Sequence, residues 1–364
     1  MSTGRQDGLA GTTRDERAAG RFAGYVVTFG EAMLRLTPPG NERLERTQSL
    51  GISGGGAELN TATGLACFGI PTTFVTVLPD NPLGRWLVRS ARAHGVDDAG
   101  IQLQPEDGGR MGVYFLEEAV DPRASAVTYD RANSAMARIE PGRFDWPTIL
   151  QGAAAFHVSG ITPALGPGCR TETLTAIRVA RELGVPVAFD LNYRSKLWSE
   201  AEAADCFLEI VPGVDILFAG KGALRTFFHI EGQVADVLAR ARAELGIGVV
   251  AMPRKKNVGS RGVRLSSWAL GPSGELARAP WVETEIVDRL GGGDAFAAGF
   301  LAGYLEARVA GDDELAADLD LSRAVALGTA ASALKHTVPG DFLCVSRPEI
   351  EAVASGVEAG TLQR

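Results

Sequence analysis

A run of three glycines followed by an aspartate is the part of this sequence best suited to chemistry. Gly291, Gly292, Gly293 and Asp294 follow an apolar stretch and open a helical pattern. Backbone N–H groups at the start of a helix attract an anion, and the helix dipole adds to this attraction. Asp294 could cap the helix or accept a proton from a reacting group. Three successive glycines favour the close approach of a ligand, because a simple turn needs only one.

A second glycine cluster, Gly54 to Gly56, lies in a predicted glycine-rich loop at 51–56 and also precedes a helical pattern. Its backbone could approach a polyol, with Asn60 orienting hydroxyl groups, or it could be a flexible loop. The stretch Gly51-Ile52-Ser53-Gly54-Gly55 fits the nucleophile elbow of serine hydrolases. That motif needs an apolar strand directly before it, whereas residues 43–50 are polar, and none of the four histidines carries a further signature. The pattern therefore argues against a hydrolase.

A third candidate site follows an apolar stretch that ends near Leu191. Arg194 lies just after it, where open α/β sheets place their ligands. A guanidinium can hold a carboxylate or a phosphate through two parallel hydrogen bonds. It could equally form a structural pair with Asp190. The residue types alone leave both interpretations open.

Other common phosphate and metal motifs are absent. The sequence has no Walker A motif, no H-E-x-x-H and no cysteine cluster, and its four cysteines lie far apart, as is typical of reduced thiols. It also has no apolar run of about 18 residues and no apolar signal region near its N-terminus. The net charge of −8 gives no general attraction to nucleic acid or to an anionic membrane. We therefore expect a cytoplasmic protein without nucleic-acid or membrane partners.

Strands that alternate with helices must position these residues. The first half of the pattern predicts strands at 25–29, 73–77, 154–158, 185–191 and 216–219, and helices at 57–68, 83–94, 170–183 and 200–210. Strands at 248–252, 262–268 and 282–287 follow, with long helices near 294–307 and 320–336. Such alternation predicts the α/β class, with a mostly parallel central sheet and helices on both faces.

Two segments break the alternation, near 34–50 and 108–132. Both have extended patterns without a helix, and we expect them to form a small β-lid outside the main sheet. Residues 1–24 are polar, rich in glycine and without period, which predicts a disordered tail. The rest of the 364-residue chain, over 25–355, is expected to form one domain that carries the lid.

The order and spacing of five motifs resemble those of the ribokinase-like (PfkB) carbohydrate kinases, above all the 2-keto-3-deoxygluconate kinases. The motifs are Gly30-Glu31 with Leu34-Arg35-Leu36, Gly55 to Asn60, Asp190 to Arg194, Asp288 to Phe296, and Leu334 to Asp341. The resemblance runs from about Tyr25 to the last helix and implies a three-layer fold with a β-lid. It also implies transfer of the ATP γ-phosphoryl group to a terminal hydroxyl, with Mg²⁺ and, as a further candidate, a monovalent cation.

Carried over by position, the resemblance assigns Asp294 as the catalytic base and Gly291, Gly292 and Gly293 as the anion hole. The residues that would hold a sugar acid are Gly55, Gly56, Asn60, Tyr114, Tyr129, Arg131 and Arg194. Contacts to ATP would come from Arg254, Gly293 and His336. This assignment suits phosphoryl transfer, which needs mainly alignment and charge stabilisation. The partners implied are the sugar acid, ATP and a second copy of the chain bound through the β-lid.

Two departures from the family pattern concern the metal and the nucleotide. The Asn-x-x-Glu motif, whose Glu helps to order the Mg²⁺ shell, is replaced here by Gly220 and Ala223. The Gly-x-x-Gly nucleotide loop is replaced by a basic loop at 252–263, and the metal ligands stay unassigned. One alternative is a kinase of a neutral sugar such as fructose, or of 5-keto-2-deoxygluconate. An alternative from another class is a catalytically weak protein that binds sugar or nucleotide.

Overall fold

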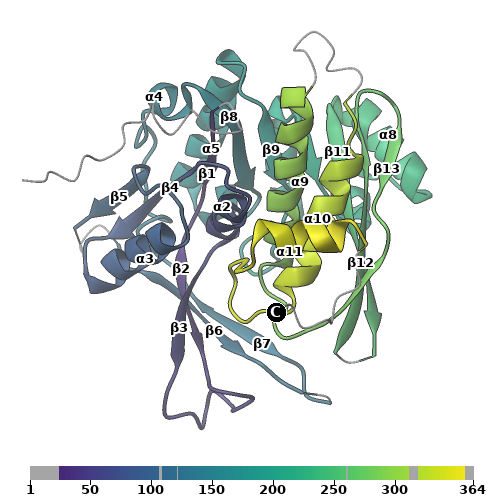
Figure 1. Ribbon diagram of the computed structural model, residues 1–364. Coiled ribbons are helices and arrows are strands. Elements are labelled where there is room, and N and C mark those ends of the chain that lie inside the picture. The colour runs from purple at the N-terminus through teal and green to yellow at the C-terminus, as the bar shows by residue number, and fades with distance from the viewer. Residues whose placement is uncertain (1–23, 106–108, 121, 260, 311–318, 357–364) are drawn as a thin grey trace, which may run out of the picture.

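The computed structural model describes residues 24–105, 109–120, 122–259, 261–310 and 319–356. Within these residues the chain forms two β-sheets, and helices pack on both faces of the larger one (Figure 1). Among the described helices, none combines the length and the apolar character that a membrane span requires. The tail expected at 1–24 lies outside the described residues except for Gly24.

The larger sheet has the strand order β13-β12-β11-β10-β9-β8-β1-β4-β5, with β14 paired to β12. Its strands are β1 (Tyr25–Phe29), β4 (Thr72–Pro79), β5 (Ile101–Gln104), β8 (Ala153–Ser159), β9 (Val187–Asp190), β10 (Ile216–Phe218), β11 (Val249–Val258), β12 (Gly262–Leu270), β13 (Leu276–Arg278) and β14 (Val282–Glu285). The strands from β5 through β11 pair in parallel, and the three that follow are antiparallel. The predicted mostly parallel sheet is confirmed.

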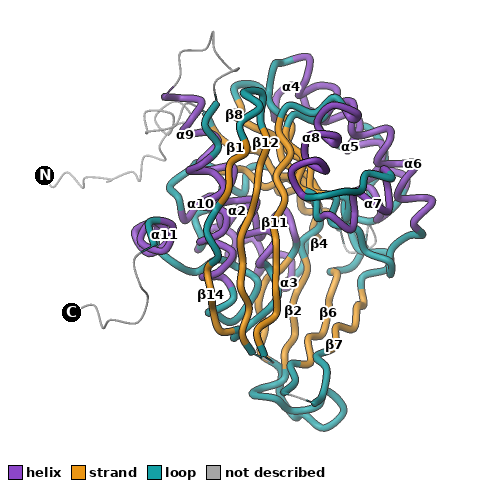
Figure 2. Tube along the Cα trace, turned by 90° about the vertical axis from the view of Figure 1, so that its right-hand side faces the viewer, coloured by secondary structure: helices purple, strands orange, loops and turns teal. Residues whose placement is uncertain are grey.

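Helices cover both faces of this sheet, which is what a parallel sheet requires (Figure 2). One face carries α2 (Ala57–Cys67), α9 (Gly292–Ala310), α10 (Ser322–Lys335) and α11 (Arg347–Ala354). The other carries α4 (Trp146–Leu150), α5 (Pro167–Glu182), α6 (Glu200–Ile210), α7 (Lys221–Phe228) and α8 (Val234–Leu245), while α3 (Pro82–Ala93) packs against the lid. Successive residues of a strand point to opposite faces of the sheet, so the strands contribute to a core on each face. Phe218 of β10 packs on Phe300 of α9, and Phe189 of β9 packs on Phe207 of α6.

The smaller sheet, which we call the lid, has the order β3-β2-β6-β7 and projects away from the main sheet (Figure 1). Its strands are β2 (Met33–Thr37), β3 (Gly51–Gly55), β6 (Gly112–Glu117) and β7 (Ala126–Asp130). The expectation that 51–56 is a loop was wrong, because β3 pairs with β2 along its length. Turns and irregular chain occupy 38–50 instead of an extended segment. Glycine is a poor strand former, but a Cβ at Gly54 would lie 2.9 Å from Leu87 and Phe342, so close packing favours glycine there.

The basic stretch at 252–263 was also wrongly expected to be a loop. Strands β11 and β12 form a long antiparallel hairpin that pairs Val250 with Leu270 at one end and Val258 with Gly262 at the other. Within it, the Arg254 guanidinium lies 4.7 Å from the centre of the Trp268 ring and 5.1 Å from that of Trp281. Cation–π contacts of this kind hold Arg254 on the hairpin.

Candidate active site

The first turns of α2 and α9 meet where the lid adjoins the main sheet. Asn60 of α2 donates a hydrogen bond from Nδ2 to Oδ2 of Asp294 on α9, over 2.7 Å. The first N–H groups of a helix have no acceptor within it, and both helix dipoles have their positive ends here. The fold thereby builds a site suited to a negatively charged group.

A cavity of about 70 Å³ opens at this junction. Its lining comes from segments far apart in the sequence: Glu31, Met33, Gly56, Ala57, Asn60, Tyr114, Tyr129, Arg131, Ile161, Arg194, Leu290, Gly291, Asp294 and Asp341. The fold thus brings together the proposed base, one anion-hole glycine and most of the proposed sugar contacts. Among the described residues, the proposed site members outside this lining are Gly55, Gly292, Gly293, Arg254 and His336.

Burial decides the electrostatic state of Asp294. Desolvation raises the pKa of its carboxyl to about 7, although the hydrogen bond from Asn60 favours the ionised form. The negative charge of Asp190 adds to the rise, and the positive charge of Arg194 opposes it. A carboxyl with a pKa near neutrality can both take and give a proton at physiological pH, as general acid–base catalysis requires.

The glycine loop lies directly on the C-terminal segment of the chain. Gly291 has φ of +79°, and a Cβ there would overlap the carbonyl oxygen of Asp341. A Cβ at Gly292 would lie 2.5 Å from the His336 ring, whereas one at Gly293 would meet nothing within 4 Å. Position 291 therefore accepts only glycine without rearrangement, and 293 faces open space.

The two arginines of the cavity differ in their partners. Arg131 forms an ion pair with Glu31 and lies over the ring of Tyr129, 5.7 Å from its centre. Arg194 is exposed, and within the described part of the chain its guanidinium forms no hydrogen bond or ion pair. It also lines an adjoining cavity of about 360 Å³, together with Asp190. Arg194 is thus the arginine of the pair whose two-pronged donor is available to a ligand.

The lid supplies the aromatic wall of the cavity. Tyr114 on β6 and Tyr129 on β7 are register partners, and their ring centres lie 5.8 Å apart. Burial raises the pKa of the Tyr114 hydroxyl, which therefore stays protonated and able to donate a hydrogen bond. Gly55, although outside the lining, is adjacent: a Cβ there would lie 2.9 Å from an Asp341 carboxylate oxygen.

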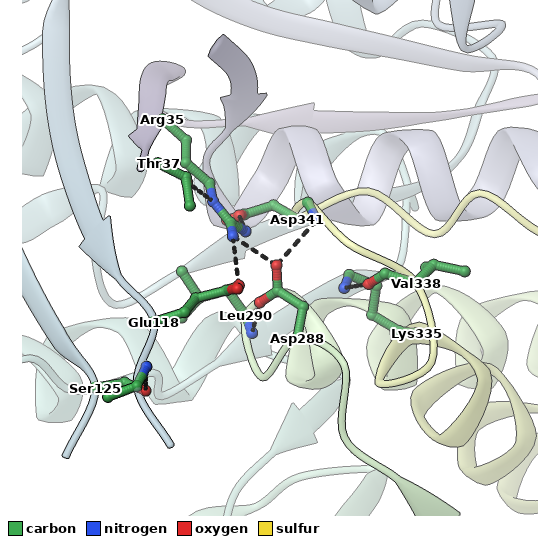
Figure 3. A network of polar contacts seen from close by, with 11 residues as sticks. Arg35, Thr37, Glu118, Ser125, Asp288, Leu290, Lys335, Val338 and Asp341 are labelled. Carbon is green, nitrogen blue, oxygen red and sulfur yellow. Dashed lines mark hydrogen bonds and ion pairs between the residues drawn. The ribbon is translucent and has the colours of Figure 1, made fainter. Parts of the chain in front are cut away.

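Residue-by-residue reasoning from the sequence missed a buried ionic cluster beside the cavity (Figure 3). Arg35 of the lid is 2% exposed, and its guanidinium reaches Asp288 at 2.6 Å and Asp341 at 2.8 Å. Glu31, which pairs with Arg131, was missed as well. All four lie inside the quoted motifs, but nothing in a single sequence shows that residues 306 positions apart are hydrogen-bonded. Their positions inside the quoted motifs were the one signal in the sequence that could have pointed to these residues.

None of the three proposed ATP contacts lines either of the two cavities described above. The Arg254 guanidinium lies over the rings of Trp268 and Trp281. The His336 ring packs against Gly292, and its Nδ1 lies 2.6 Å from the Ser332 carbonyl oxygen. Burial lowers the pKa of His336, so the ring is neutral near pH 7.

Over the described ranges, no group of three or more acidic, histidine or cysteine side chains forms a ready metal site.

Comparison with known proteins gives a consistent result. Residues 23–347 match the family described as pfkB family carbohydrate kinase. The 2-dehydro-3-deoxygalactonokinase of Haloferax volcanii is 36% identical over 92% of this chain and 98% of its own length. The solved 2-dehydro-3-deoxygluconokinase of Thermotoga maritima is 37% identical, with a TM-score of 0.85 over 92% of this chain and 99% of that one.

A sugar kinase of Pyrococcus horikoshii, solved in complex with ATP, shares the fold at 20% identity, with a TM-score of 0.69 over 90% of this chain and 99% of that one. These matches confirm the ribokinase-like fold and the phosphotransferase class that the motifs predicted. A cavity lined by the proposed base, by Gly291 and by two lid tyrosines suits such an enzyme, and the chain belongs to the pfkB family of carbohydrate kinases.

Proposed function

We propose that this kinase transfers the γ-phosphoryl group of ATP to the terminal hydroxyl of 2-keto-3-deoxygluconate or a similar sugar acid. The observation that carries the proposal is the placement of Arg194, a guanidinium without an ion-pair partner among the described residues, on the same cavity as Asp294. Two similar proteins are named as kinases of 2-dehydro-3-deoxy sugar acids, and "dehydro" and "keto" denote the same group.

In this proposal each side chain has one task. Asp294 accepts the proton of the terminal hydroxyl as that oxygen bonds to the γ-phosphorus, and the bond from phosphorus to the bridging oxygen of ADP breaks. Asn60 holds the carboxylate in place, and the N–H groups of residues 291–293 stabilise the charge of the migrating phosphoryl group. Arg194 holds the substrate carboxylate. The residues left to contact the sugar chain are Gly55, Gly56, Tyr114, Tyr129 and Arg131.

ATP and Mg²⁺ are the proposed cofactors, with a monovalent cation as a further candidate. The larger cavity beyond Arg194 could take the triphosphate, and Asp190 and Glu200 bring carboxylates to it. Mg²⁺ keeps several waters and is usually held by phosphates and one or two carboxylates, so this donor set fits a metal that arrives with ATP. Bound there, Mg²⁺ would neutralise phosphate charge. Arg254 and His336 stay proposed ATP contacts.

Arg194→Lys should lower kcat/KM for 2-keto-3-deoxygluconate about tenfold or more. An ammonium cannot form the bidentate contact of a guanidinium, which is worth roughly 1.5–3 kcal/mol. The kcat/KM for fructose, which has no carboxylate, should change little. Steady-state kinetics with both sugars, for the wild type and the variant, checks this prediction.

A matched control is Arg178→Lys, because Arg178 pairs with Glu182 on the exposed surface of α5. It should leave all constants unchanged. Equal losses on the two sugars, or a wild-type preference for fructose, would make Arg194 a structural residue and favour a neutral-sugar kinase.

The substituted metal motif leads to a second prediction. Because Gly220 and Ala223 offer no side-chain ligand, the rate should keep rising into millimolar free Mg²⁺, as a sparse donor set implies. A Cβ at Gly220 would meet nothing within 4 Å, so Gly220→Asn with Ala223→Glu can be accommodated at least at that position. The double variant should need less Mg²⁺ for half-maximal rate in a titration at fixed ATP. Saturation of the wild type at micromolar free Mg²⁺ would contradict this.

We also propose that two copies associate through the lid. Strands β3 and β7 are its two edges, and β7 is mostly exposed. Unpaired strand edges offer N–H and C=O groups to another chain. This surface therefore suits a second copy better than the main sheet, whose faces helices cover.

A further inference from the structure

Lys335, the last residue of α10, carries a fully buried ammonium group. Its exposure is 0%, and Nζ donates a hydrogen bond to the carbonyl oxygen of Val338 over 3.1 Å (Figure 3). Lysine is almost never fully buried without a partner, because the charge loses its hydration. Desolvation lowers the Lys335 pKa here, while the charges of Asp288 and Asp341 oppose that change. A charge buried at this cost in free energy indicates that Lys335 contributes to function.

The surroundings of Lys335 are rich in carboxylates. Asp288 accepts hydrogen bonds from the N–H groups of Leu290 and Gly340, and it forms an ion pair with Arg35. The same guanidinium pairs with Asp341 and, at 3.3 Å, with Glu118, whose side chain is 31% exposed. One arginine thus faces three acids. A second cation is needed to bring the buried part of the cluster, Asp288 and Asp341, to neutrality.

This cluster lies directly beneath the glycine loop. A Cβ at Gly291 would be 3.2 Å from Cε of Lys335. The segment just before the loop is hydrogen-bonded to the segment that follows α10, since the Val287 N–H donates to the His336 carbonyl oxygen over 2.7 Å. Without a second cation, the two carboxylates and Arg35 would leave one uncompensated negative charge here. That charge would repel a phosphoryl group held by the loop, and the low dielectric of the interior would strengthen the repulsion.

We propose that Lys335 is a positioning residue for phosphoryl transfer. Its ammonium balances Asp288 and Asp341 and supports the Gly291 backbone, so that the N–H groups of the loop can receive the migrating phosphoryl group. This inference rests on the proposed function. It adds a cation that touches neither substrate and acts through the loop.

The test separates charge from packing. Lys335→Gln keeps a donor for the Val338 carbonyl oxygen and removes the charge, and it should lower kcat about 30-fold or more, within the range of lost electrostatic stabilisation. The dissociation constant for the sugar, measured by calorimetry without ATP, should change less than about threefold, because the residue does not line the sugar cavity. A purely structural residue would instead lower the melting temperature and both constants together.

A double variant supplies the decisive comparison. Lys335→Gln with Asp341→Asn loses one positive and one negative charge, so its kcat should exceed that of Lys335→Gln alone by about fivefold or more if charge balance matters. Where Lys335→Gln fails to fold, the charge-balanced double variant is compared with Asp341→Asn, and equal kcat in those two proteins supports the proposal.

Two further measurements close the test. Lys335→Ala should regain activity in methylammonium chloride but not in an equal ionic strength of tetramethylammonium chloride, while the wild type should respond equally to both salts. The inference would be overturned if Lys335→Gln had the same kcat as the wild type. It would also be overturned if the double variant had a lower kcat than Lys335→Gln alone. Failure of the proposed function has a different signature: the wild type would prefer a neutral sugar, and the Lys335 variants would then be measured on that sugar.

Discussion

Asp294→Asn lowers kcat by about 10²–10⁴-fold if the carboxylate is the base toward the sugar hydroxyl. Asparagine keeps the shape of the side chain and can still accept the hydrogen bond from Asn60, so sugar binding should be largely kept. What disappears is the proton acceptor. Single-turnover rates with saturating ATP, together with sugar binding by calorimetry, measure the two effects separately.

The pH dependence gives the same prediction a second readout. The pKa of Asp294 is raised to about 7, and a base acts only when ionised, so wild-type kcat/KM should fall about tenfold per pH unit below that value. The pH profile of kcat/KM for the variant should not show this fall. Because the folded-state pKa lies above the unfolded value of 3.8, the free energy of unfolding falls as the pH rises from about 4 to about 7 and stays lowered above that, so at about pH 8 the variant should melt no lower than the wild type.

Asp205→Asn, at an exposed position of α6, is the control and should match the wild type in rate and pH profile. A loss below tenfold in a folded Asp294→Asn protein would reduce Asp294 to a helix cap.

The second large effect is expected at Gly291. Alanine there needs φ of +79° and would overlap the Asp341 carbonyl oxygen, so the loop must move away from the C-terminal segment. Loss of one aligned backbone donor costs about 10²–10³ in kcat in other anion holes, and we expect a loss of that order here. The measurement is kcat at saturating concentrations of both substrates, with the melting temperature as a check on folding.

Gly293→Ala is the comparison within the same loop, because a Cβ at that position meets nothing within 4 Å and its φ is not positive. It should lose much less activity than Gly291→Ala and melt no lower than the wild type. Equal losses at the two positions would mean that backbone geometry at 291 is not what the reaction depends on.

The sequence predicted local features well, because short patterns carry them. The glycine loop, Asp294 at a helix start and Arg194 at a strand end were all predicted from neighbouring residues, and Gly291, Asp294 and Arg194 line one cavity. Strand β3 was missed because three of its five residues are glycine, and the pairing that makes it a strand comes from β2. The hairpin that carries Arg254 was missed because a run of basic residues resembles a solvated loop.

The ionic cluster could not be predicted for a different reason. Arg35 lies in an alternating strand, where a polar residue normally faces solvent, and Lys335 ends a helix, where a cation normally faces the dipole. Tertiary packing turns both inward. Only the fold brings the two cations to the same pair of acids.

The loop after β9 contacts the lid through Lys196, whose ammonium also lies over the Tyr129 ring, 5.7 Å from its centre. Lys196, two residues beyond Arg194, donates a hydrogen bond to the Val127 carbonyl oxygen on β7 over 3.0 Å. One such exposed bond is worth on the order of 0.5–1.5 kcal/mol, which favours the fastened state by about tenfold at most. Breaking this bond therefore costs little free energy. We expect it to orient the lid over the cavity while opposing the release of a phosphorylated sugar only weakly.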